Sequence, residues 1–174
     1  MRRWLIALLL ALLPTTAHAD GRRFLAYYVE WDPHSWVSLS ENWDALDAVS
    51  AQWVWVDACG GLTSRDDQTL KAEAAARGVP VRPSLFTFSK WLNHQLLTEP
   101  TATRLVENIV GYVQAEGYPG FDLDLEDVAP ADRDAYGSLV GRLADALHAG
   151  GKLLTLAVPP KEREEPGGFA AAYD

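Results

Sequence analysis

The stretch Gly120-Phe121-Asp122-Leu123-Asp124-Leu125-Glu126 decides how the rest of the chain is interpreted. Acidic and apolar residues alternate in it, so a β-strand would place the three acids on one face and the three apolar side chains on the other. The acids would form a row about 13 Å long, with Glu126 at its carboxyl end. Because neighbouring like charges disfavour ionisation, at least one acid is expected to hold a proton at neutral pH. A protonated acid beside an ionised one is typical of acid–base catalysis on a sugar.

Two other interpretations of this alternation stay open. It is also the pattern of a solvated edge strand in an antiparallel sheet, and clustered carboxylates also suit Mg²⁺ or Ca²⁺. Helical patterns flank the acidic stretch, which favours a parallel sheet covered on both faces. A metal-dependent hydrolase would need ligands at other strand ends, where Asp57 is the clear candidate. We prefer acid–base catalysis, which requires no metal and no cofactor.

The composition narrows the class of partner. The chain has 174 residues, a formal charge of −9, a sequence pI near 4.8 and 48% hydrophobic residues, which is enough to build a core. The acidity argues against nucleic acid as a partner, and no basic run suggests an anionic membrane surface. Seven tryptophans and six tyrosines suit a polysaccharide, because flat rings stack on sugar faces.

Residues 1–19 are expected to be a secretory signal peptide. Arg2 and Arg3 supply the charged region, residues 5–13 the apolar region, and Ala17-His18-Ala19 an A-x-A cleavage site before Asp20. The apolar run is too short for a permanent membrane anchor. We therefore expect a protein that is secreted or held in the cell envelope, without an anchor after cleavage, whose residues 20–174 form the fold.

Strand signals alternate with amphipathic helical patterns along residues 20–174. The expected strands are 24–29, 52–56, 79–88, the acidic stretch and 152–158, and the expected helices run from Ser40 to Val49, from Asp66 or Asp67 to Gly78, from Thr101 to near Gly117, and from Pro130 to Gly150. This rhythm predicts an α/β fold with parallel strands and right-handed crossovers. Trp53 and Trp55 are interpreted as core residues of their strand.

Two architectures fit the alternation. A five-stranded doubly wound sheet suits the length, whereas a (β/α)₈ TIM barrel normally takes about 250 residues. The chain stops at residues 171–174 without a closing element, which suggests an interrupted sequence. We therefore expect the N-terminal portion of a TIM barrel, with about its first five β/α units and two unpaired edges.

The acidic motif Gly120-x-Asp122-x-Asp124-x-Glu126, on the fourth expected strand, resembles the signature of glycoside hydrolase family 18, the chitinase-like enzymes. Residues 26–33, 126–133, 156–161 and 168–174 narrow the resemblance to spore cortex-lytic enzymes and related peptidoglycan N-acetylglucosaminidases. The resemblance implies a retaining mechanism in which the 2-acetamido group of the substrate is the nucleophile. It also implies that Glu126 is the general acid and base, that Asp124 holds the acetamido group, and that Asp122 shares a proton with Asp124.

The sequence also departs from the family's pattern at several positions. Pro119-Gly120 stands where the family often has Asp-Gly, and Leu125 stands where an aromatic residue commonly precedes the acid. The run Ser84-Leu85-Phe86-Thr87 replaces a Ser-x-Gly-Gly pattern, which favours the peptidoglycan branch over chitinases. A tyrosine and a tryptophan that the family carries on later strands have no counterpart.

Several side chains are candidates for sugar contact. Tyr27 and Trp31 follow the first expected strand, whose carboxyl end would face a barrel's site, and Tyr27 suits core packing equally. The resemblance adds Ser84. Asn93 and His94, with Trp91, follow the third expected strand and could line the cleft, although a loop histidine is more often a surface residue.

These expectations combine into one hypothesis with one rival. The chain is expected to be a secreted glycosidase that cleaves β-linked N-acetylglucosamine polymers, with peptidoglycan ahead of chitin. The rival is a non-catalytic carbohydrate-binding protein on the same barrel. Such proteins usually lack the acid equivalent to Glu126, and its presence favours the enzyme.

Overall fold

The computed structural model describes residues 23–160 and 169–173. The expected signal peptide therefore lies outside the described residues. The strands are β1 (Leu25–Val29), β2 (Ala48–Val56), β3 (Leu62–Ser64), β4 (Val81–Thr87), β5 (Gly120–Leu125) and β6 (Leu153–Leu156). The helices are α1 (Pro33–Glu41), α2 (Gln68–Arg77), α3 (Lys90–Leu97), α4 (Thr101–Ala115) and α5 (Arg133–Ala149). Short 3₁₀ turns are η1 (Trp43–Ala45), η2 (Pro130–Asp132) and η3 (Phe169–Tyr173).

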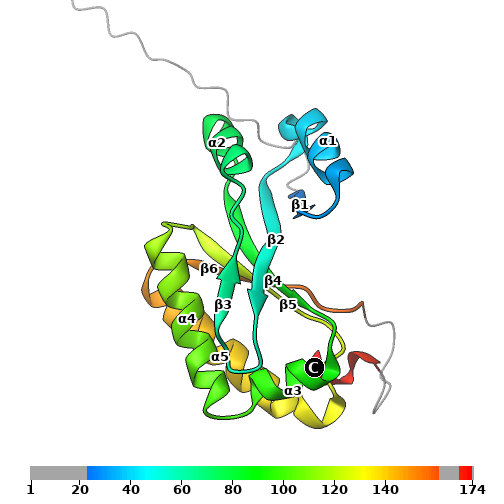
Figure 1. Ribbon diagram of the computed structural model, residues 1–174, viewed down its shortest axis with the longest axis vertical. Helices are drawn as coiled ribbons and strands as arrows, with labels where there is room; N and C mark the ends of the chain where they lie inside the picture. The colour runs from blue at the N-terminus through cyan, green and yellow to red at the C-terminus, as the bar shows by residue number, and fades with distance from the viewer. Residues whose placement is uncertain (1–22, 161–168, 174) are drawn as a thin grey trace, which may run out of the picture.

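Five parallel strands form the sheet in the order β1-β2-β4-β5-β6, and β3 folds back antiparallel on β2 (Figure 1). The order follows the chain without reversing, whereas a doubly wound sheet reverses at a switch point. The doubly wound alternative is therefore wrong. Within the described residues β1 and β6 each have one parallel neighbour, so the sheet is open, and the structure has the α/β class without a closed barrel.

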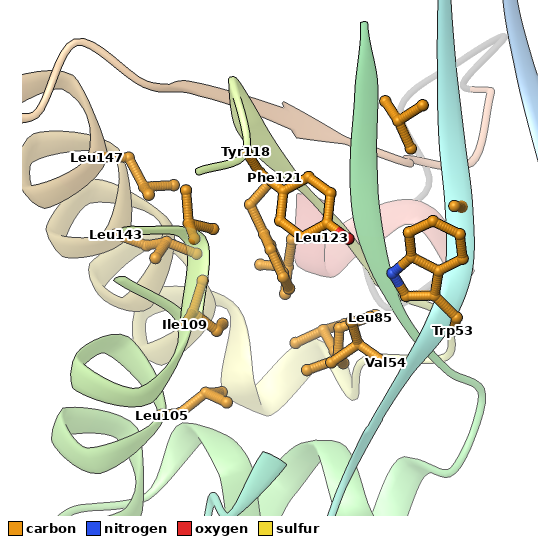
Figure 2. Packing of buried hydrophobic residues seen from close by; sticks show 14 of the residues in the cluster. Trp53, Val54, Leu85, Leu105, Ile109, Tyr118, Phe121, Leu123, Leu143 and Leu147 are labelled. Atoms are coloured by element: carbon orange, nitrogen blue, oxygen red, sulfur yellow. The ribbon is translucent and has the colours of Figure 1, made fainter. Parts of the chain in front are cut away.

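The hydrophobic core lies between the sheet and helices α4 and α5 (Figure 2). Phe121, Leu123 and Leu125 of β5 are fully buried in this core. Leu105 and Ile109 of α4 face them at a four-residue spacing, as the helical period requires. The apolar face of the acidic strand is thus the helix-covered face. The acids lie on the opposite face of the sheet, which is called the acid face below.

The prediction of a helix from Ser40 to Val49 is wrong. The helix here is α1, which begins at Pro33, and Val49 belongs to β2. Asp32 caps α1 by accepting a hydrogen bond from the backbone N–H of His34, and proline suits the first helical position. The N-cap therefore lies at Asp32, eight residues before Ser40.

Other boundaries match their signals. Asp67 caps α2 by accepting from Thr69 and Leu70, and Gly78 ends it in the left-handed conformation at φ 69°. Gly120 begins β5 where any side chain would collide with the backbone carbonyl of Leu153 on β6. That close approach explains why the acidic motif opens with glycine.

Candidate active site

Asp122 is fully buried on the acid face and accepts hydrogen bonds from hydroxyl groups on other strands. The hydroxyl of Ser84 on β4 donates to its Oδ2 at 2.8 Å, and the hydroxyl of Thr155 on β6 donates to its Oδ1 at 2.6 Å. Tyr27 on β1 also hydrogen-bonds Asp122. Burial and the charges of Asp122 and Asp124 raise the pKa of Tyr27, so its hydroxyl keeps the proton that it donates. Hydrogen bonds from β1, β4 and β6 therefore fix Asp122.

Asp124 lies two residues further along β5 and is 4% exposed. Its Oδ2 accepts a hydrogen bond of 3.0 Å from the side-chain amide of Gln52 on β2. Its Oδ1 is buried and has no hydrogen-bond partner among the described residues. Burial, then the negative charges of Glu126 and Asp122, raise the pKa of Asp124 to about 6, against the opposing effect of Gln52. A buried carboxyl group with this pKa exchanges its proton near neutral pH.

Glu126 comes directly after the last residue of β5, and its side chain is exposed. It borders a hollow of about 280 Å³ lined by residues 157–160 after β6. The acidic row therefore runs from a fully buried residue, through a buried one, to an exposed one. Glu126 is the most exposed of the three acids.

The backbone around Glu126 is held on three sides. Its N–H donates to the carbonyl of Thr87 at the end of β4, at 2.7 Å, and its carbonyl accepts from the side-chain amide of Asn93 on α3. The hydroxyl of Tyr173 in η3 donates to the carbonyl of Leu125 at 2.7 Å and accepts from the N–H of Val128 at 3.2 Å. Hydrogen bonds from β4, α3 and η3 thus fix the backbone position of the exposed acid.

Asp127, the next residue, has a left-handed backbone conformation at φ 55°. This conformation is uncommon for residues other than glycine and is tolerated best by Asn and Asp. Lys90 of α3 pairs with its carboxylate at 3.2 Å. The extended backbone of β5 therefore ends at a left-handed residue directly after Glu126.

The structure places the sequence candidates as follows. Tyr27 and Ser84 lie on the acid face and contact Asp122, while Trp31 is 58% exposed at the carboxyl end of β1. His94 is not in a loop: it lies on α3 and its Nδ1 is 2.9 Å from Asp132. Asn93, expected to line the cleft, is fully buried and acts on the backbone of Glu126.

Three contributors to the site were missed: Gln52, Thr155 and Tyr173. Thr155 is the single polar residue of β6, and Gln52 is one of two polar residues in the otherwise apolar β2. A polar residue in such a strand requires a buried partner. That signal was present in the sequence. Trp55, expected in the core, is 37% exposed. Trp53 is buried as expected.

The carboxylates do not form a metal site in this geometry. Among residues 23–160 and 169–173, no three His, Cys, Asp or Glu side chains are grouped so that they would hold a metal ion. Asp57 instead stabilises its own turn, because its Oδ1 accepts the N–H groups of Cys59 at 2.8 Å and Gly61 at 2.9 Å. The same part of the chain contains no helix of the length and apolarity needed to cross a bilayer.

An exposed glutamate beside a buried carboxyl group of raised pKa, at the carboxyl ends of parallel strands, is typical of enzymes that cleave sugar polymers. The chain is 48% identical over 75 residues to YdhD of Bacillus subtilis, which carries the name of a sporulation-specific glycosylase. This match covers 42% of the chain and 18% of YdhD. The chain is also 32% identical over 88 residues to the cortical fragment-lytic enzyme of Bacillus cereus, a match that covers 50% of the chain and 20% of that enzyme. No model of a protein family matches.

Solved structures show the same fold. A chitinase from Chromobacterium violaceum superposes with a TM-score of 0.75 at 25% identity, over 86% of this chain and 50% of the chitinase. The spore cortex-lytic enzyme SleL of Bacillus megaterium gives 0.77 at 22% identity, over 87% of this chain and 38% of SleL. The resemblance to cortex-lytic and chitinase-like enzymes is therefore confirmed. The chain spans about a fifth of the curated relatives it matches and at most half of these two solved chains.

Proposed function

We propose that this protein is a glycoside hydrolase that cleaves β-linked N-acetylglucosamine polymers, with bacterial peptidoglycan as its substrate. The observation that carries the proposal is the pairing of the exposed Glu126 with the buried Asp124, whose pKa is raised to about 6. The similarity to a cortical fragment-lytic enzyme supports peptidoglycan over chitin. The acidic motif, which resembles the signature of glycoside hydrolase family 18, supports the same reaction class.

The proposed reaction retains the configuration at the anomeric carbon and uses the substrate as nucleophile. Glu126 donates its proton to the glycosidic oxygen as the bond to C1 breaks, while the acetamido oxygen bonds to C1 and forms an oxazolinium ion. Asp124 hydrogen-bonds the acetamido N–H and stabilises the positive charge that develops there. Glu126 then removes a proton from water as the water oxygen bonds to C1 and the bond between C1 and the acetamido oxygen breaks. This step opens the oxazolinium ring and restores the protonated acid. Asp122, held by its hydroxyl donors, helps to raise the pKa of Asp124 through its negative charge.

We also propose that the described strands are the first part of an eight-stranded barrel and that the protein is exported. The sequential strand order supports the barrel, as does the greater length of the matched solved chains. The A-x-A site at residues 17–19 supports export. Amino-terminal sequencing of the exported protein is expected to begin at Asp20.

The test of activity uses the protein expressed from its complete gene, with peptidoglycan and chitin oligosaccharides as substrates. We expect wild-type protein to release reducing ends from peptidoglycan with the β-configuration retained, as NMR of the fresh product would show. Glu126→Gln is expected to lower the rate by about 10²–10⁴-fold. Glu107→Gln, an exposed glutamate on the outer surface of α4, is the matched control and should keep the wild-type rate.

The rival function is that of a non-catalytic carbohydrate-binding protein. It predicts that wild-type protein and Glu126→Gln bind peptidoglycan equally and that neither releases reducing ends. Loss of the rate in Glu107→Gln to the same extent would also count against the assignment of Glu126, since that residue lies away from the acid face.

A further inference from the structure

Arg65 places a positive charge at the carboxyl end of the sheet, the end at which Glu126 lies. It directly follows β3, which pairs with the last three residues of β2, and its backbone N–H donates to the carbonyl of Trp53 at 3.1 Å. Its side chain is 75% exposed. The chain as a whole has a formal charge of −9. The charge of Arg65 is therefore opposite to that of the protein that carries it.

A β-bulge in β2 turns the neighbour of Arg65 toward the acid face. The register of β2 on β4 shifts between Gln52 and Val54, so β2 has one residue more than β4 at this point. After the bulge Trp55 takes the acid face, whereas period-two alternation from Gln52 would place it in the core. The guanidinium of Arg65 lies 5.5 Å from the centre of the Trp55 ring. The bulge therefore provides Arg65 with a support on the side of the sheet where the acids lie.

Two contacts hold the guanidinium in place and leave it accessible to solvent. The face of Trp55 attracts the cation, and Nη1 of Arg65 lies 3.5 Å from a carboxylate oxygen of Glu30, whose side chain is 19% exposed. This ion pair is longer than a charge-assisted hydrogen bond, which is about 2.8 Å. A guanidinium has five N–H donors in a planar fork, so Arg65 can still bind a second carboxylate.

Arg65 lies within reach of a glycan that is bound at Glu126. In the sheet β4 lies next to β5, and β2 lies next to β4. Val54 pairs with β3 on one edge of β2 and with β4 on the other, so β3 is the third strand from β5. Because adjacent strands lie about 4.8 Å apart, three spacings amount to about 14 Å. A glycan of several sugars that extends from Glu126 across β4 and β2 covers this distance.

The charge of peptidoglycan gives this cation a possible ligand. Alternate sugars of peptidoglycan carry a lactyl group or a lactyl-linked stem peptide, whose carboxylates make the polymer anionic, whereas chitin is neutral. The acidic row and the net charge of −9 repel an anionic polymer. A guanidinium that pairs with a carboxylate of the polymer offsets this repulsion and favours the anionic glycan over the neutral one.

We propose that Arg65 determines substrate specificity by pairing with a carboxylate on the side group of an alternate sugar, a few sugars away from the bond that is cleaved. The inference rests on the proposed function, because it takes a glycan bound at Glu126 as the ligand. It differs from a purely structural role for Arg65. A residue that only supports Trp55 would affect the binding of neutral and anionic glycans alike.

The test measures binding by calorimetry to the protein expressed from its complete gene, in a Glu126→Gln background so that no probe is cut. The probes are a peptidoglycan tetrasaccharide with its stem peptides, the same tetrasaccharide after an amidase has removed them, and neutral tetra-N-acetylchitotetraose. Arg65→Gln is expected to weaken binding of the peptide-bearing probe about threefold to tenfold at low salt and to leave binding of chitotetraose unchanged. A loss that persists with the amidase-treated probe assigns the contact to the lactyl carboxylate, and a loss that disappears assigns it to the stem peptide.

Arg77→Gln is the matched control. The guanidinium of Arg77 lies 5.4 Å from the centre of the Trp43 ring and pairs with Glu73 of α2, so it has the same kinds of neighbour away from the acid face. This variant should bind all three probes as the parent does. Arg65→Lys keeps the charge and should bind the peptide-bearing probe more tightly than Arg65→Gln does. Thermal unfolding of each variant checks that it folds.

Three results would overturn the role of Arg65. They are unchanged affinity of Arg65→Gln for the anionic probes, an equal loss for the neutral probe, and an equal loss in Arg77→Gln. Hydrolysis by protein with Glu126 intact separates this inference from the proposed function. Glu126-dependent cleavage with Arg65-independent binding refutes the role of Arg65 alone, whereas Arg65-dependent binding of the anionic probes without any cleavage refutes the glycosidase and leaves the carboxylate contact standing.

Discussion

The side-chain amide of Asn93 donates a hydrogen bond to the backbone carbonyl of Glu126, although 33 residues separate them in the chain. Asn93 is fully buried, and its Oδ1 has no partner among the described residues. Among the described residues, the side chain of Asn93 therefore makes this one hydrogen bond. Its acceptor is the peptide group of the candidate acid, Glu126. Since small displacements of a catalytic group cost large factors in rate, this contact has a testable consequence.

Asn93→Ala is expected to lower kcat by about tenfold or more with little change in KM, because the acid is displaced while the sugar contacts remain. Steady-state kinetics on peptidoglycan would measure both constants. Asn108→Ala is the matched control, since Asn108 likewise donates from its side chain to a backbone carbonyl, that of Gly60 at 2.8 Å, away from the acid face. Equal losses of kcat in the two variants would contradict a positioning role for Asn93.

The left-handed turn at Asp127 allows a second test. A β-branched residue at φ 55° is strained by about 1–3 kcal/mol, whereas glycine adopts this conformation freely. Asp127→Val is therefore expected to shift the turn and reduce kcat severalfold, and Asp127→Gly to keep the wild-type kcat. Both variants lose the ion pair with Lys90, so the comparison isolates the backbone. If valine and glycine support the same kcat, the conformation of this turn does not set the position of Glu126.

The acidic strand could be predicted because its signal is local. Alternation within seven residues determines which face each side chain takes, and Phe121, Leu123 and Leu125 are buried among the helices as expected. The cap of α2 at Gly78 is equally local. The prediction of a helix from Ser40 is wrong because Asp32-Pro33 is a stronger start signal than a single serine.

The features that the sequence did not predict depend on contacts between residues far apart in the chain. Trp55 was assigned to the core by period-two alternation, and that alternation fails at a bulge that depends on the pairing of β2 with β4. Tyr173 contacts the backbone at Leu125 from 48 residues away, and no pattern near either residue indicates the pairing. The acids and their partners Tyr27 and Ser84 could be identified from the sequence, but the contact made by Tyr173 could not.

Asp66 connects β3, α2 and α4 through a shared carboxylate. It accepts the hydroxyl of Tyr112 at 2.7 Å and also those of Ser64 and Tyr118, with Lys71 at 3.4 Å. Burial acts to raise the pKa of Asp66, but these donors outweigh it and lower the pKa. Asp66→Asn is therefore expected to destabilise the fold by about 1–3 kcal/mol at pH 7, measured by urea unfolding.

The effect of Asp66 should depend on pH. Because its pKa is lowered in the folded state, its stabilisation is present above the unfolded value of about 3.9 and is lost as the pH falls through the folded value. The difference between wild type and Asp66→Asn should therefore shrink below about pH 4. Asp145→Asn, an exposed carboxylate on α5, removes the same charge and should change stability little. A constant difference from pH 7 to pH 3 would refute the carboxylate's role.

Asp124 should show the opposite dependence. Its folded pKa of about 6 lies above the unfolded value of about 3.9, so its contribution favours folding below pH 3.9 and is lost as the pH rises through 6. Asp124→Asn cannot ionise, and we expect it to be more stable than wild type at pH 8, by on the order of 2 kcal/mol, and not at pH 4. Urea unfolding at both pH values measures this, with the exposed Asp44→Asn as control. A variant that is less stable than wild type at pH 8 would show that ionised Asp124 stabilises the fold, contrary to the desolvation that raises its pKa.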